Sequence, residues 1–161
     1  MVDYYGEIKV AIVMGSENDM EHARKIKEEL DGWKIPSTYR IGSAHRTPEH
    51  VLGIVKELNK SLESMMIMSI AGGVDALSGE MAANSRWPVI SCPPSDKYVQ
   101  SCLGNPAGTP NATILKPENA ARFAAQYFSA IEPKLADDLM QRIESKKAEI
   151  IKADEKYRGQ K

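Results

Sequence analysis

Hydrophobic positions along the chain fall into short apolar runs that are separated by amphipathic segments. The runs at residues 9–14 and 65–70 are almost continuously apolar, and each is followed at once by small residues. Runs of this length are typical of strands buried on both faces of a parallel sheet. The segments at 20–30 and 48–59 carry apolar residues at helical spacing, which predicts helices that pack one face on that sheet.

The same alternation continues to the C-terminus. Strands are expected at residues 9–14, 37–41, 65–70, 87–92 and 112–115. Helices are expected at residues 20–30, 48–59, about 98–103, 116–131 and 134–157, with another that follows a small-residue loop at 71–79. Strands that alternate with helices predict an α/β fold with a parallel sheet. We expect a single domain over residues 1–161, with its core at about 8–131.

The last predicted helix, residues 134–157, is rich in charge but carries an intermittent apolar stripe. The stripe consists of Leu135, Leu139, Ile143, Ile150 and Ile151. Because this helix follows a completed sheet, we expect it to pack on a partner subunit or to clamp the domain. A frayed surface helix is the alternative.

Composition narrows the class of protein. A formal net charge of −1 gives no field that would attract a polyanion, so no nucleic-acid partner is expected. No apolar run approaches membrane length, and a cytoplasmic protein with no membrane contact is the expectation. Cys92 and Cys102 fit neither a disulfide framework nor a metal site, and no cluster of His, Asp and Glu has metal-ligand spacing.

Four loops follow the predicted strands, at residues 15–19, 42–46, 71–79 and 92–110. In a parallel sheet such loops share one edge, where ligands bind. Their small residues, hydroxyls and helix N-termini favour an anion. With Arg46 and Ser43 for a phosphate, Asp19 for sugar hydroxyls and His45 for proton transfer, the loops predict a phosphorylated small molecule as the ligand.

Other interpretations remain open from the residues themselves. Ser16 and Asp19 could simply cap the following helix, and His22 and His50 lie within predicted helices, where we expect surface positions. The loops lack the glycine patterns of dinucleotide and triphosphate sites, and no nucleophile motif is present. A non-catalytic module that binds flavin mononucleotide would need stacking walls, for which the loops offer chiefly Trp87 and Tyr98. A racemase or isomerase that acts on another sugar phosphate is a further alternative.

Several motifs together resemble one enzyme family. They are Gly-Ser-x-x-Asp at 15–19, Ser-Ala-His-Arg-Thr-Pro at 43–48, Ala-Gly-Gly at 71–73 and a Pro/Gly-rich loop that ends at residue 110. Over residues 8–131 the chain resembles the aminoimidazole ribonucleotide (AIR) carboxylase and carboxyaminoimidazole ribonucleotide mutase family of purine biosynthesis. The resemblance implies a flavodoxin-like three-layer α/β/α sandwich with a five-stranded parallel sheet and an extra C-terminal helix. It also implies a homo-oligomer, typically an octamer.

The resemblance further implies formation of 4-carboxy-5-aminoimidazole ribonucleotide (CAIR) from AIR and CO₂ without a cofactor. It assigns His45 as the general acid/base, Ser16, Ser43 and Arg46 to the phosphate, and Asp19 to the ribose. The full set of substrate-binding residues that it implies is Gly15, Ser16, Asp19, Ser43, Ala44, Arg46, Ala71, Gly72, Gly73, Ser91, Cys92 and Pro93.

The family has two branches that differ in the carboxyl source. Arg46 and Gly73 resemble the mutase branch, whereas Ala76, Ser78 and the Cys-Pro-Pro sequence at 92–94 resemble the carboxylase branch. More positions favour direct carboxylation, and the mutase is the alternative. Asp75 replaces a neutral residue of both branches, and it could either contact the ligand or cap the next helix.

Overall fold

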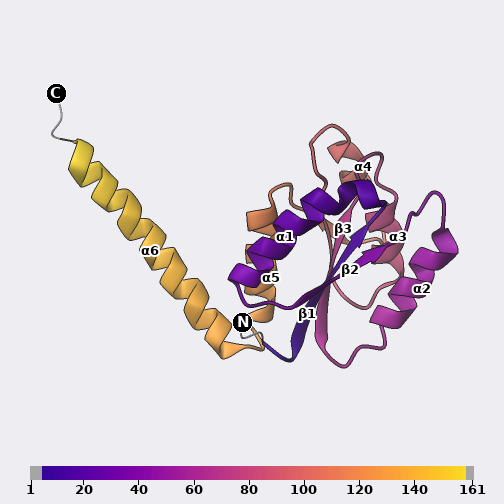
Figure 1. Cartoon of the computed structure of the whole chain (residues 1–161), viewed down its shortest axis with the longest axis horizontal. Coiled ribbons are helices and arrows are strands. Elements are labelled where there is room, and N and C mark those ends of the chain that lie inside the picture. Colours follow the sequence, from indigo (N-terminus) through magenta and orange to yellow (C-terminus); the bar gives the residue numbers. More distant parts are fainter. Residues whose placement is uncertain (1–4, 159–161) are drawn as a thin grey trace. The chain divides into compact units, whose positions relative to one another are not determined.

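The computed structural model describes residues 5–158 and contains a five-stranded parallel sheet with the strand order β2-β1-β3-β4-β5 (Figure 1). The strands are β1 (Ile8–Met14), β2 (Ser37–Ile41), β3 (Ser64–Ile70), β4 (Val89–Ser91) and β5 (Asn111–Thr113). β1 and β3 pair along their whole length. This order is that of flavodoxin-like folds, in which the chain reverses its direction of progress across the sheet between β1 and β3.

Helices cover both faces of the sheet and make the three layers that the resemblance implied. The helices of the described residues are α1 (Met20–Gly32), α2 (Pro48–Leu58), α3 (Leu77–Asn84), α4 (Val99–Leu103), α5 (Pro117–Phe128) and α6 (Pro133–Tyr157), and a 3₁₀ turn, η1 (Glu17–Asp19), precedes α1. α2 and α3 lie on one face, while α1 and residues 117–124 of α5 lie on the other (Figure 1). The predicted α/β architecture is confirmed.

Hydrophobic packing on both faces of the sheet explains why the sequences of β1 and β3 are almost continuously apolar. Ala11, Val13 and Ile67 point into a core that α2 and α3 complete with side chains such as Val51 and Met81. The alternate residues of the same strands, such as Ile12 and Met68, are also fully buried. Both faces of each strand are therefore covered, which removes the polar alternation of a half-exposed strand.

Three hydrogen bonds join the C-terminal ends of α2 and α3, at the edge of the sheet away from the loops that follow the strands. The indole Nε1 of Trp87 donates to the carbonyl oxygen of Leu58 over 2.8 Å. Asn59 donates from Nδ2 to the carbonyl of Asn84, and its Oδ1 accepts from the amide of Arg86, each over 2.9 Å. We call these contacts the Asn59 junction.

Some boundaries differ from those predicted, for local reasons. β4 is shorter than expected at both ends, where Pro88 and Pro93 have no N–H with which to extend the ladder. The loop after β3 is shorter too, since α3 already begins at Leu77, two residues before the expected end of the loop at residue 79.

The chain divides into two compact units at Ala124, and α6 belongs to the second. The single domain over residues 1–161 therefore stays a prediction. α6 has Pro133 in its first turn, where a missing N–H costs nothing, and Glu132 accepts a hydrogen bond from the amide of Lys134. Within residues 5–158, no helix combines the length and apolarity needed to cross a bilayer.

Candidate active site

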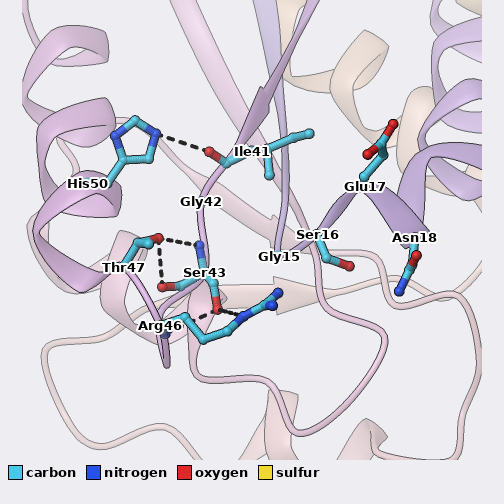
Figure 2. Close-up of a pocket in the computed structure, with 10 residues that line it drawn as sticks. All are labelled: Gly15, Ser16, Glu17, Asn18, Ile41, Gly42, Ser43, Arg46, Thr47 and His50. Carbon is cyan, nitrogen blue, oxygen red and sulfur yellow. Dashed lines mark hydrogen bonds between the residues drawn. The ribbon is translucent and has the colours of Figure 1, made fainter.

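A cleft lies at the carboxyl ends of β1, β2 and β3, beside the switch point of the sheet. It has two adjoining lobes of about 520 and 480 Å³. The residues that line both lobes are Gly15, Ser16, Asn18, Ser43 and Arg46. The larger one, the His50 lobe, is completed by Glu17, Ile41, Gly42, Thr47 and His50 (Figure 2). The other, the His45 lobe, is completed by Asp19, His45, Ala71, Gly72, Gly73 and Val74.

The loop after β1 is braced by the buried carboxylate of Asp19. Its Oδ2 accepts hydrogen bonds from the amide of Ser16 over 3.1 Å and from the Ser16 hydroxyl over 3.2 Å. The amide contact is the reciprocal half of a capping box around η1. Ser16 and Asp19 therefore both cap η1 and line the His45 lobe.

The loop after β2 is a tight turn that presents Arg46 between the two lobes. The amide of Ser43 donates to Thr47 Oγ1 over 3.0 Å, and the amide of Thr47 donates to the Ser43 carbonyl over 2.7 Å. The Arg46 Nε donates to the Ser43 hydroxyl at 3.5 Å (Figure 2). Within residues 5–158 the Arg46 guanidinium has no carboxylate partner, so an anion in the cleft could pair with it.

His45 is exposed and lines the lobe that is named after it. Its ring takes part in no hydrogen bond among the described residues, so that it can accept a proton from a ligand. Ala44, its neighbour, lines neither lobe and packs instead against the core under α2 and α3. His50 is exposed as expected, and its Nε2 donates to the carbonyl of Ile41 over 3.2 Å (Figure 2).

The loop after β3, residues 71–74, forms the opposite wall of the His45 lobe. In the described part of the chain, the backbone amides of Gly72, Gly73 and Val74 donate to no other group. Unpaired amides at the surface of a cleft are suited to an anionic or carbonyl oxygen. Asp75 follows them, is buried and lines neither lobe; its carboxylate accepts from the amide of Ser78 over 2.9 Å. Of its two open roles, the structure supports the helix cap.

The three expected residues after β4 occupy a different place. Ser91, Cys92 and Pro93 are buried, and none of them lines either lobe. Their role at the substrate stays a prediction that the cleft geometry does not support. Burial, and in smaller measure the charge of Glu118, raises the pKa of Cys92 to about 12, which makes this thiol a poor nucleophile.

The surface position expected for His22 is wrong. Its Nε2 lies 3.6 Å from Cys92 Sγ, and the side chain is half-buried because the first turn of α1 packs against the end of β4. Burial is the main cause that lowers the pKa of His22. Helical periodicity could not reveal this contact, since the two residues are 70 positions apart.

Two further classes of ligand find no support at the cleft. Among residues 5–158, no group of three or more His, Cys, Asp and Glu residues could hold a metal ion. Neither lobe is lined by the stacking residues that a flavin would need: Trp87 lines a separate cavity of about 370 Å³, and Tyr98 lines neither lobe.

Comparison with known proteins gives a consistent picture. Residues 9–149 match the family model described as AIR carboxylase. The chain is 40% identical over 154 residues to the phosphoribosylaminoimidazole carboxylase of Treponema denticola, with 92% of this chain and 97% of the relative covered. It is 39% identical over 156 residues to the protein of the same name from Archaeoglobus fulgidus, with 94% and 86% covered.

The fold of a solved relative agrees with the sequence match. The crystal structure of Treponema denticola PurE superposes with a TM-score of 0.88 at 39% identity, covering 93% of this chain and 98% of that one. The matches span the sheet, the cleft and its loops. This chain belongs to the AIR carboxylase family.

Proposed function

We propose that this protein forms CAIR from AIR and CO₂ in purine biosynthesis. The observation that carries the proposal is that one lobe of about 480 Å³ brings together His45, Arg46 and the unpaired amides of residues 72–74. Relatives with the printed name phosphoribosylaminoimidazole carboxylase support the choice of reaction. A cavity of this size suits a mononucleotide.

The proposed binding mode follows the chemistry of the three loops. The Arg46 guanidinium and the Ser43 hydroxyl bind the phosphate, as charged and neutral donors. Asp19 uses Oδ2 for Ser16, which leaves Oδ1 to accept from a ribose hydroxyl. The amides of Gly72 and Gly73 then face the base and the carboxyl group, where negative charge develops as the new bond forms.

The proposed reaction needs one proton transfer and no redox partner. The amino group of AIR pushes electron density to C4, which attacks the carbon of CO₂ and becomes tetrahedral. The new carboxylate takes the electron pair of the broken C=O π bond. His45 removes the proton from C4, and the pair of the C–H bond restores the aromatic ring. An imidazole suits this step because it exchanges protons near neutral pH.

Replacement of His45 by Asn tests the proposal. We expect the turnover number to fall by about 10²- to 10⁴-fold, which is the range for loss of a general acid/base. Binding of AIR, measured by calorimetry, should change little, because the phosphate and ribose contacts remain. His50→Asn is the matched control, since that imidazole lines the other lobe. Turnover by H45N at the wild-type rate would remove His45 from the mechanism.

The mutase reaction is a second candidate, because Arg46 and Gly73 line the His45 lobe and resemble that branch of the family. It would yield CAIR from the N-carboxy isomer of the same ribonucleotide, with His45 again acting on the C4 proton. One assay separates the two reactions. Purified protein is given AIR with CO₂ and, separately, N-carboxyaminoimidazole ribonucleotide, and the substrate that yields CAIR at the higher kcat/KM assigns the branch.

We further propose that the protein is a homo-oligomer that assembles through α6 and resides in the cytoplasm. Met140, Ile150, Ile151 and Tyr157 leave large apolar side chains exposed on α6, and an interface would cover them. Both cysteines are free, which suits a reducing compartment. Light scattering on the wild type and on an Ile150→Asp/Ile151→Asp variant tests the assembly, with Lys152→Glu as a control on the same helix. An unchanged mass for the double variant would contradict it.

A further inference from the structure

The wall loop of the His45 lobe, residues 71–74, has hydrogen bonds at its two ends, whereas the backbone amides in between make none within residues 5–158. At its upstream end, the amide of Gly15 donates to the carbonyl of Ile70 over 2.9 Å. The amides of Gly72, Gly73 and Val74 have no partner within residues 5–158. With two glycines in four residues, the loop cannot fix its own conformation. Its position therefore depends on what anchors the downstream end.

Asp75 is that downstream anchor, and it uses both its backbone and its side chain. Its amide donates to the hydroxyl of Ser101 over 2.8 Å. One carboxylate oxygen accepts from the amide of Ser78 over 2.9 Å, and the other accepts from the hydroxyl of Ser91 over 2.7 Å. Asp75 is 5% exposed and Ser91 is fully buried. One residue thus connects α3, β4 and α4.

Hydrogen bonds extend this cluster to β5. The Ser91 hydroxyl also lies 3.2 Å from the sulfur of Cys102, and Nδ2 of Asn111 donates to the carbonyl of Cys102 over 3.1 Å. The same Nδ2 lies 3.3 Å from the hydroxyl of Ser78. A buried polar network in which the members satisfy one another is rigid and fixes a single arrangement.

We propose that Asp75 is a positioning residue that sets the loop 71–74 at the correct distance from His45 by anchoring it to α3, β4 and α4. The inference rests on the proposed carboxylation or mutase reaction. Asp75 lines neither lobe, so it acts through the loop and does not touch the substrate. A displacement of the loop by about 1 Å would misalign the base against His45, and misplacement of that size costs about 10²-fold in rate.

Two variants of Asp75 distinguish the effect of its hydrogen bonds from the effect of its side-chain volume. Asp75→Ala removes the acceptors of Ser78 and Ser91, so that only the backbone contact with Ser101 still anchors the downstream end of the loop. We expect kcat to fall by about 10- to 100-fold with KM for AIR within about threefold of wild type, because phosphate and ribose are held by the other two loops. Asp75→Asn keeps the shape and one acceptor, and its Nδ2 can donate to Ser91. It should restore kcat to within about threefold of wild type.

A stability-matched control shows whether lost kcat reflects lost folding. Ile35→Ala removes a fully buried side chain just before β2, at the edge of the sheet opposite the cleft, and it should lower Tm by several degrees without reaching the loop. We expect I35A to keep its kcat. If D75A keeps wild-type kcat at an assay temperature well below its Tm, or if I35A loses kcat equally, Asp75 is not a positioning residue.

Crystal structures of the free wild type, D75A and D75N test the anchor without any assay. We expect Gly72 and Gly73 to move by about 1 Å or more in D75A and to stay in place in D75N. A loop that is unmoved in D75A overturns the inference, even if the wild type were to turn over neither substrate. A wild type that is inactive towards both substrates, together with a loop that moves, would overturn the proposed function alone.

Discussion

A Cβ atom added to Gly72 would lie 2.7 Å from Oδ1 of Asp19, closer than real Cβ atoms approach an oxygen. The Asp19 carboxylate cannot easily move aside, because it is buried and its other oxygen accepts two hydrogen bonds from Ser16. Two loops that line the same lobe are therefore fitted to each other at a single contact, and Gly72 provides the space for Asp19.

Gly72→Ala should displace Asp19 and disturb both loops. We expect kcat/KM for AIR to fall by about tenfold or more, since ribose and base contacts shift together. Gly73→Ala is the matched control for folding, because a Cβ there meets no atom within 4 Å. Thermal unfolding should show a lower Tm for G72A and an unchanged Tm for G73A. If G72A and the wild type had equal Tm and equal activity, the Asp19 carboxylate would be able to move aside without loss of stability or activity.

Gly42 and Gly53 should respond to alanine in opposite directions. A Cβ at Gly42 would lie 3.0 Å from Val51 Cγ2 and 3.2 Å from Ile54 Cδ1, in a closely packed core. We expect Gly42→Ala to lower the free energy of unfolding by about 1–3 kcal/mol. Gly53 lies inside α2 with open space around it, so Gly53→Ala should raise that free energy by about 0.5–1 kcal/mol. Chemical denaturation measures both, and a stabilised G42A variant would contradict the packing at the end of β2.

The pKa of His22 links stability to pH. Burial, the main cause, lowers this pKa from its ordinary value of 6.5 in the folded protein. As the pH falls through that value, the unfolded chain binds a proton that the folded protein does not, and stability is lost until the folded pKa is reached. We expect the free energy of unfolding to decrease as the pH falls below about 7. His22→Gln should flatten this slope, and an equally steep slope in H22Q would assign the effect to other groups.

Both thiols should be inert while the protein is folded. Burial raises the pKa of Cys92 to about 12 and also raises the pKa of Cys102, so that neither forms the reactive thiolate near neutral pH. Iodoacetamide at about pH 8 should label neither cysteine in the native protein and both after denaturation. Loss of activity through labelling of native Cys92 would show that the end of β4 opens to solvent.

The fold could be predicted because the elements that define it follow local rules. β1 and β3 could be recognised from their apolar runs and α2 from its helical spacing, without knowledge of distant contacts. The predicted boundaries of these three elements agree with the structure to within one residue. Short strands were harder. Only three residues of β4 pair in the sheet, between Pro88 and Pro93, which have no N–H to extend the ladder.

The clustering of candidate site residues could be predicted where they follow strand ends, and not where distant segments meet. Ser16, Asp19, Ser43, His45 and Arg46 follow β1 and β2, so topology alone brings them together. Motif likeness could not show that Ser91 and Cys92 point away from the cleft. It also could not show that Asp75 holds Ser91 and Ser101, which are 16 and 26 residues away. Such partners are set by tertiary packing, which leaves no periodic trace in the sequence.

The Asn59 junction has a mechanical consequence for the cleft. It fixes α2 at its C-terminal end, whereas the opposite end carries Thr47 and the turn that presents Arg46. α2 has 11 residues and is therefore about 16 Å long at 1.5 Å per residue. A rigid tilt of α2 by about 5° about Asn59 would therefore displace the end next to Arg46 by about 1.4 Å and change the width of the cleft, while Asn59 itself would hardly move.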